Sequence, residues 1–70
     1  MKYKIGDLLV PVEIDEEFSS IAYIADYKKL EELYQLTWIY KDGRTAQILY
    51  DYIMLEDVLT YGYKLIPVRE

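Results

Sequence analysis

The pair Asp42-Gly43, which lies between two apolar segments, constrains the fold more than any other feature of this chain. Asp-Gly between segments rich in β-forming residues is a strong hairpin signal. A two-residue loop would mix large aromatic and polar side chains on one face. A three-residue loop, Lys41-Asp42-Gly43, pairs Tyr40 with Arg44 and separates apolar from polar side chains better. It also puts Gly43 in the left-handed conformation, where glycine costs least, so we predict this hairpin.

This register determines which residues of the hairpin share a face. Trp38 then lies opposite Ala46, and Leu36 lies opposite Ile48. One face carries Leu36, Trp38, Tyr40, Ala46, Ile48 and Tyr50. The other face carries Gln35, Thr37, Ile39, Thr45, Gln47 and Leu49. We expect the first face to point into the core, because strand register follows the pattern that buries one face.

Most of the chain is typical of short strands, because it is rich in β-branched and aromatic residues. The expected strands are Leu8–Val12, Ile21–Tyr27, Leu36–Tyr40, Thr45–Ile53 and Lys64–Val68. The stretch 26–36 is also compatible with a short helix, because its apolar residues recur at helical spacing. Several short strands and one tight hairpin predict an all-β fold, a five-stranded antiparallel barrel with a short helical turn at most. The expected core residues are Leu8, Val10, Leu36, Trp38, Ile48 and Leu65.

Length and composition exclude several classes of protein. The 70 residues are expected to form one domain, residues 1–70. The chain has neither Cys nor His, which removes disulfides, the usual zinc sites and the usual nucleophile–base pairs. It has no apolar run long enough to span a bilayer, and its N-terminus lacks the pattern of a cleaved signal peptide. The net charge of −5 opposes general binding to a phosphate backbone.

The carboxylates are the only abundant groups with catalytic or ligating chemistry. Glu13, Asp15, Glu16 and Glu17 could bind Ca²⁺ or Mg²⁺, but they lack the glycine and the spacing of a known calcium loop. A solvated acidic loop is the simpler interpretation. Ser19-Ser20 has no base near it in the sequence, and a small barrel offers little room to tune an acid–base pair. We therefore expect no enzyme activity, no catalytic residue, no metal ligand and no cofactor.

Three short motifs resemble the small SH3-like β-barrel proteins that are common in tailed-phage genomes. KIGDLLV, residues 4–10, is similar to their entry strand, YKDGRT, residues 40–45, to their central hairpin, and LEDVL, residues 55–59, to the turn before their closing strand. The resemblance implies an SH3-like barrel located in a virion or in the host cytoplasm. The chain departs from the pattern in a longer tail after residue 59 and in Ser19-Ser20, where a glycine often stands.

The letters LYDY at residues 49–52 also occur in the ligand groove of eukaryotic SH3 domains. There the motif comes early and Gly-Asp follows it, whereas here Gly6-Asp7 comes first. The groove strand of those domains also begins with a Trp pair, and this chain has only Trp38. We therefore interpret LYDY as ordinary strand residues and not as part of a proline-binding groove.

Nine tyrosines are more large aromatic residues than a barrel of this size can enclose. Tyr27, Tyr52, Tyr61 and Tyr63 are expected at strand ends or turns. Tyrosine is enriched in protein interfaces, so we predict that at least two of these four contact another protein chain. The alternative is that they pack at the rim of the core with their hydroxyls in water.

These observations favour a non-enzymatic protein-interaction module. Together with the phage resemblance, they suggest a minor structural or accessory protein of the virion, in capsid decoration or at a connector or tail joint. The expected partners are other protein chains, either virion proteins or a host protein. We expect no contact with a membrane. Assembly of the chain into a homo-oligomer is a further possibility. The alternative is a small phage-encoded regulator that binds a host protein. A nucleic-acid-binding barrel ranks lower, because the net charge disfavours it.

Overall fold

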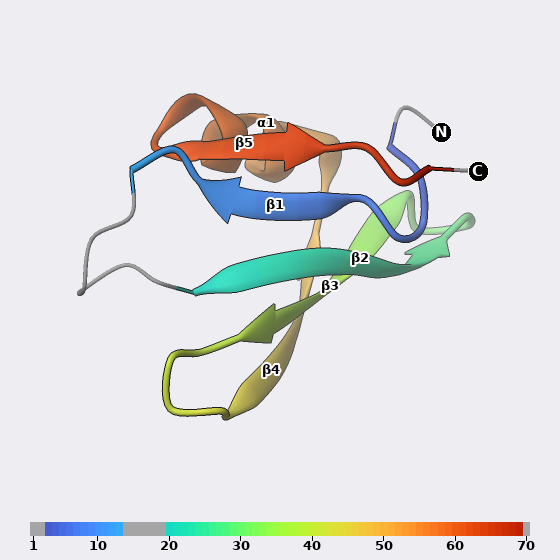
Figure 1. Cartoon of the computed structure of the whole chain (residues 1–70). Helices are drawn as coiled ribbons and strands as arrows, with labels where there is room; N and C mark the ends of the chain where they lie inside the picture. Colours follow the sequence, from blue (N-terminus) through green and yellow to red (C-terminus); the bar gives the residue numbers. More distant parts are fainter. Residues whose placement is uncertain (1–2, 14–19, 70) are drawn as a thin grey trace.

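A computed structural model describes residues 3–13 and 20–69, which form one antiparallel sheet with a helix against it (Figure 1). The elements in chain order are β1 (Leu8–Pro11), β2 (Ile21–Lys28), β3 (Leu33–Ile39), β4 (Thr45–Tyr50), α1 (Tyr52–Thr60) and β5 (Tyr63–Ile66). The strand order across the sheet is β4-β3-β2-β1-β5, and every neighbouring pair is antiparallel. The prediction of five antiparallel strands is confirmed. The competing helix at 26–36 is wrong, because most of this stretch belongs to β2 and β3.

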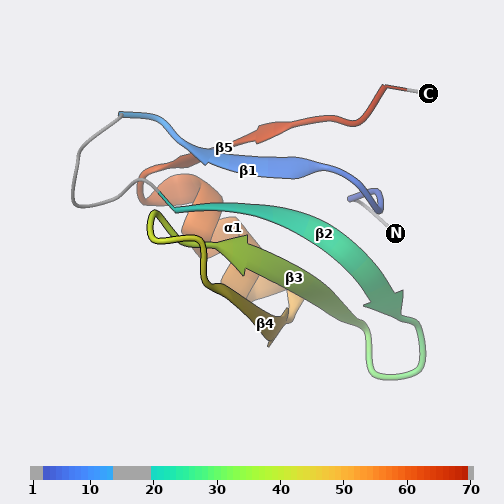
Figure 2. The same ribbon diagram turned by 60° about the horizontal axis from the view of Figure 1, so that its bottom comes forward.

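The sheet does not close into the predicted barrel. β4 and β5 are its two edges, and no ladder joins them within the described residues. The chain between these edges forms α1, which contacts both β4 and β5 and lies against one face of the sheet (Figures 1 and 2). The helix therefore buries the core face, and pairing between the edge strands is not needed to cover it.

The helix itself corrects the expectation of a short helical turn at most. α1 has nine residues, and Asp51 stops β4 and begins the helix. The backbone of Asp51 is extended, and its Oδ1 accepts a hydrogen bond of 2.8 Å from the Met54 N–H. This contact satisfies one of the free N–H groups at the helix start. Leu55 is buried, and Val58 and Leu59, three and four residues later, pack on the same core.

The central hairpin has the predicted register. Trp38 pairs with Ala46, and Leu36 pairs with Ile48. The Tyr40 N–H donates to the Arg44 carbonyl at 2.8 Å, and Gly43 has a φ of +89°. The three-residue loop with a left-handed glycine is therefore confirmed.

The core lies between α1 and one face of the sheet. Its buried members are Tyr3, Leu9, Ala22, Ile24, Tyr34, Leu36, Trp38 and Leu55. The predictions for Leu36 and Trp38 are confirmed, and Leu65 is half-buried and packs on this core. The prediction for Val10 is wrong, because Val10 is half-buried on the face of β1 opposite to Leu9.

Two predicted core residues, Leu8 and Ile48, are exposed. In β1 the buried residue is Leu9, and Leu8 therefore points to the opposite face of the sheet. Ile48 lies opposite Leu36 as predicted, but it belongs to the edge strand β4, which has a neighbouring strand on one side only. The alternation of apolar and polar residues does not show which strand lies at an edge, so it cannot predict that Ile48 is exposed.

The Gly6-Asp7 pair forms a turn before β1 that connects both ends of the described chain. Asp7 is buried, and its carboxylate accepts hydrogen bonds of 2.9 Å from the Lys4 N–H and from the Val68 N–H. Gly6 has a φ of +100°, and a Cβ atom there would lie 3.2 Å from a methyl group of Val68. Glycine is therefore required both by the backbone conformation and by the close approach of the C-terminal segment.

Candidate functional site

We call the sheet face that points away from α1 the outer face; it is apolar on β2, β1 and β5 and carries Gln35, Thr37, Thr45 and Gln47 on β3 and β4. Its exposed large residues are Leu8, Ile21, Tyr23, Leu49 and Ile66. Each of these side chains exposes between 36% and 46% of its surface. Strand pairing places Leu8 next to both Tyr23 and Ile66, so the apolar surface continues across β2, β1 and β5. An antiparallel sheet with a solvated face usually carries polar residues there, and this face departs from that pattern.

Charged side chains on the outer face lie at its periphery. Asp26 and Lys28 form an ion pair of 3.2 Å at the end of β2, and Lys64 is exposed on the edge strand β5. The pKa of Asp26 is lowered by the Tyr27 N–H, which donates to its carboxylate, and by the neighbouring Lys28. An apolar centre with a polar rim is the usual composition of a protein interface.

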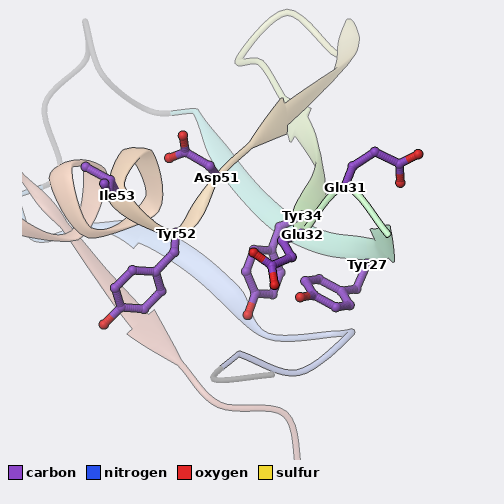
Figure 3. A pocket seen from close by; sticks show the side chains of 7 residues that line it. All are labelled: Tyr27, Glu31, Glu32, Tyr34, Asp51, Tyr52 and Ile53. Carbon is purple, nitrogen blue, oxygen red and sulfur yellow. The ribbon is translucent and has the colours of Figure 1, made fainter. Parts of the chain in front are cut away.

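A second surface feature is a cavity of about 400 Å³, which we call the acidic hollow. It is lined by Tyr27, Glu31, Glu32, Tyr34, Asp51, Tyr52 and Ile53. In Figure 3 the residues of the β2–β3 hairpin group on one side of the hollow, and those at the start of α1 group on the other. Two segments that are distant in sequence therefore build one site.

The aromatic wall of the acidic hollow is held by contacts between rings. Tyr27 and Tyr34 lie 4.7 Å apart between ring centroids, and Tyr3 meets Tyr34 edge-on at 5.5 Å. Tyr3 also stacks on Tyr52 at 6.2 Å. The Tyr3 hydroxyl donates a hydrogen bond of 2.5 Å to the Glu56 carboxylate. Four contacting rings therefore connect the two sides of the hollow and fix their relative position.

The hollow also collects three carboxylates. Asp51 is oriented by the Met54 N–H at the start of α1. Glu32 has a φ of +56°, in the left-handed region that side chains rarely adopt. No lysine or arginine in the described part of the chain forms an ion pair with Glu31, Glu32 or Asp51. The described residues also contain no group of three acidic side chains arranged to hold a metal ion.

Another hollow, of about 530 Å³, lies where β1 approaches the end of α1. Its lining residues are Pro11, Val12, Glu13, Thr60, Tyr61, Gly62 and Tyr63. The Tyr63 hydroxyl donates to the Ser20 carbonyl at 3.1 Å, and its ring meets Trp38 edge-on at 5.5 Å. Burial raises the pKa of Tyr63, and the nearby Tyr50 adds to this effect. Tyr63 is therefore anchored in the core, whereas Tyr61 is 81% exposed.

The structure thus brings the four predicted interface tyrosines together in pairs. Tyr27 and Tyr52 line the acidic hollow, and Tyr61 and Tyr63 line the other one. Tyr52 and Tyr61 are exposed, whereas Tyr27 and Tyr63 are half-buried against the core. Their contact with another chain stays a prediction.

Sequence reasoning missed the outer face and the three carboxylates of the hollow. β1 and β2 carry large apolar residues at both odd and even positions, which is the signal that could have revealed a second apolar face. Asp51 precedes an apolar run as a helix cap does. Glu31 and Glu32 give no such signal, because only the fold brings them near Asp51. Of the proposed acidic loop and serine pair, Asp15, Glu16, Glu17 and Ser19 lie outside the described residues.

Comparison with protein-family models, with curated proteins and with solved structures finds no match to this chain. Among the described residues, no helix has the length and apolar character that a membrane span requires. The functional argument therefore depends on the surfaces themselves.

Proposed function

We propose that this chain is a non-enzymatic protein-interaction module that docks on another protein chain through its outer face. The observation that carries the proposal is the continuous row of exposed apolar residues across β2, β1 and β5. Exposed apolar patches with a polar rim mark interaction sites on small soluble domains. The net charge of −5 suits a partner whose apolar contact surface is surrounded by basic groups.

The finer proposal is an SH3-like accessory protein of a phage virion, in capsid decoration or at a connector or tail joint. The positions of two motifs support it: residues 4–10 include the start of β1, and residues 40–45 form the tight hairpin. A 70-residue domain has a small core, so binding to a neighbouring chain would add stability that the isolated domain lacks. A regulator that binds a host protein would use the same face.

The test replaces two outer-face residues on the edge strands, Leu49→Lys with Ile66→Lys. Lysine is well tolerated at sheet edges, so this variant should fold. The matched control is Leu30→Lys, because Leu30 is 95% exposed in the loop between β2 and β3 and does not belong to the outer face. Circular dichroism should first show that all three proteins have the same fold.

The readout is the number of copies of each protein in purified phage particles, measured by quantitative mass spectrometry. We expect the unmodified chain and the Leu30→Lys control in a fixed ratio to the capsid protein, and the double variant to be lost from the particles. Absence of the unmodified chain from the particles would contradict the virion assignment. Equal incorporation of all three proteins would contradict docking through the outer face.

A further inference from the structure

We propose that the chain forms a symmetric dimer in which the β4 strands of two copies pair edge to edge in antiparallel orientation. β4 and β5 are the two edges of the sheet, and within the described residues each has a neighbouring strand on one side only. In Figure 1, β4 forms the lower border of the sheet, away from β1 and β5. The inference goes beyond docking through the outer face, because it involves the border of the sheet and a second copy of the same chain.

The hydrogen bonds of the central hairpin show which backbone groups of β4 lie on the open edge. The Tyr40 N–H donates to the Arg44 carbonyl, so these two residues form a hydrogen-bonded pair. Such pairs alternate with non-hydrogen-bonded pairs along an antiparallel ladder, so the residues of β4 that bond to β3 are Ala46, Ile48 and Tyr50. The residues whose N–H and C=O groups point away from β3 are Thr45, Gln47 and Leu49. No hydrogen bond within the described residues occupies these outward groups.

The two edges differ in how well they are protected against pairing with another strand. β5 has only four residues, it carries the exposed Lys64, and the Pro67 that follows it has no N–H to donate. Short length, lysine and proline are features that keep edge strands from pairing. β4 has six residues, TAQILY, without a charge, a proline or a glycine, and its Ile48 and Leu49 are 40% and 46% exposed. An uncharged edge of high β-propensity is one that another strand can join.

A second copy of β4 is complementary to this edge. When Gln47 lies opposite Gln47 of the second copy, Thr45 of each copy lies opposite Leu49 of the other. In this register all the outward N–H and C=O groups of both strands pair with one another. On the helix side of the sheet, the small Ala46 of each copy then lies opposite the exposed Ile48 of the other, which gains cover that the isolated chain does not provide.

Charge and symmetry favour a second copy over an extended segment of another protein. The antiparallel arrangement brings the Arg44 end of each strand beside the Asp51 end of the other, so a basic group meets an acidic one although each chain has a net charge of −5. The contact uses the same surface of both copies, so it closes after two copies. The protected strand β5 then lies at both borders of the joined sheet, and the expected product is a dimer and not a fibre.

The first test follows the full chain in solution by analytical ultracentrifugation and by hydrogen exchange of backbone amides in NMR. Exchange is compared at two protein concentrations, at which the ultracentrifuge shows mainly monomer and mainly dimer. We expect the amides of Thr45, Gln47 and Leu49 to exchange more slowly in the dimer, and the outward-pointing Leu65 amide of β5 to be unchanged. A chain that stays monomeric at NMR concentrations, or a dimer in which these three amides are not protected, would overturn the proposal.

A charge exchange at Gln47 tests the symmetry of the contact, because this residue lies opposite itself in the dimer. Gln47 is exposed in the single chain, so its variants should keep the fold, which circular dichroism checks. Gln47→Lys and Gln47→Glu each put two like charges face to face, so each variant alone should dimerise at least about fivefold more weakly. An equimolar mixture should dimerise at least as tightly as the unmodified chain, because lysine then lies opposite glutamate.

Two comparisons separate this contact from a general charge effect. Gln47→Lys changes the net charge of each copy from −5 to −4, so general repulsion between copies decreases while the local contact is lost. The matched control is Leu30→Lys, which adds the same charge in the exposed loop between β2 and β3 and should dimerise like the unmodified chain. Equal dimerisation of Gln47→Lys and the control, or a mixture no stronger than either Gln47 variant alone, would contradict the symmetric pairing of β4.

These tests and the particle experiment can fail independently. The apolar part of the outer face lies on β2, β1 and β5, and pairing of β4 with β4 leaves it exposed in both copies. A chain that dimerises through β4 but is absent from particles would support the edge contact and contradict the virion function. A monomeric chain that is incorporated into particles would contradict the edge contact and leave docking through the outer face supported.

Discussion

Replacement of Asp7 should reveal how much of the fold depends on one buried carboxylate. Its two oxygens accept hydrogen bonds of 2.9 Å from the Lys4 and Val68 N–H groups, and the residue is only 3% exposed. A hydrogen bond to a charged group contributes about 1.5–3 kcal/mol. Asp7→Ala removes both bonds, so it should lower the free energy of unfolding by about 3–6 kcal/mol.

Asp7→Asn is the graded control for this prediction. Asparagine keeps one acceptor oxygen, but its NH₂ group would face a backbone N–H, so one bond is lost and the expected loss is about 1.5–3 kcal/mol. A domain of this length has a total stability of about 3.5–10 kcal/mol, so Asp7→Ala should be unfolded or nearly so. The chain has one Trp, the buried Trp38, and its fluorescence in urea titrations reports unfolding. In Asp7→Asn, hydrogen exchange at the Val68 amide should also be faster. An alanine variant within about 0.5 kcal/mol of the unmodified chain would refute the reasoning.

Three further outcomes follow from the core and the hollow. Trp38→Ala should cost about 3–5 kcal/mol and abolish the cooperative urea transition, followed by circular dichroism because the variant has no Trp, so a stable variant would mean that Trp38 is not a core residue. Glu32→Gly should raise the free energy of unfolding by about 1 kcal/mol, because it removes a left-handed non-glycine residue; an unchanged urea midpoint would contradict this. The raised pKa of Tyr63 predicts stability that is fully present below pH 10 and is lost as the pH rises through the pKa of the folded state. Tyr63→Phe loses the hydrogen bond to Ser20, but its stability deficit in urea titrations should shrink between pH 9 and 11; a constant deficit would contradict the shift.

The central hairpin could be predicted from sequence because its determinants are local. Asp42-Gly43 selects the turn, and the alternation of Leu36 and Trp38 with polar residues selects the register. Both signals lie within a few residues of the structure that they specify. The turn at Gly6-Asp7 also has a local determinant in its glycine, but the hydrogen bond from the Val68 N–H to Asp7 could not be foreseen.

The helix and the edges of the sheet depend on contacts between residues that are distant in the sequence. The strand expected at Thr45–Ile53 stops at Tyr50, because Asp51 begins a helix whose apolar residues the sheet can cover. The pattern of β1 fits either register, and only packing against α1 selects Leu9 over Leu8. The acidic hollow is less predictable still, because its two sides are joined only when α1 docks against the sheet. Tyr27 and Tyr52 of this hollow were named from the sequence, but the carboxylates that accompany them were not.

The composition of the chain gives a physical reason for the outer face. Hydrophobic residues make up 53% of the sequence, yet the described residues form only one short helix with which to cover a five-stranded sheet. α1 can cover one face, so apolar residues such as Leu8 and Tyr23 stay on the other. Each large apolar side chain that a partner covers contributes about 1 kcal/mol or more to binding, since burial yields about 25 cal/mol per Å². Polar residues at these positions would cost the core little, so the proposed docking through the outer face gives a reason for the apolar residues that stand there.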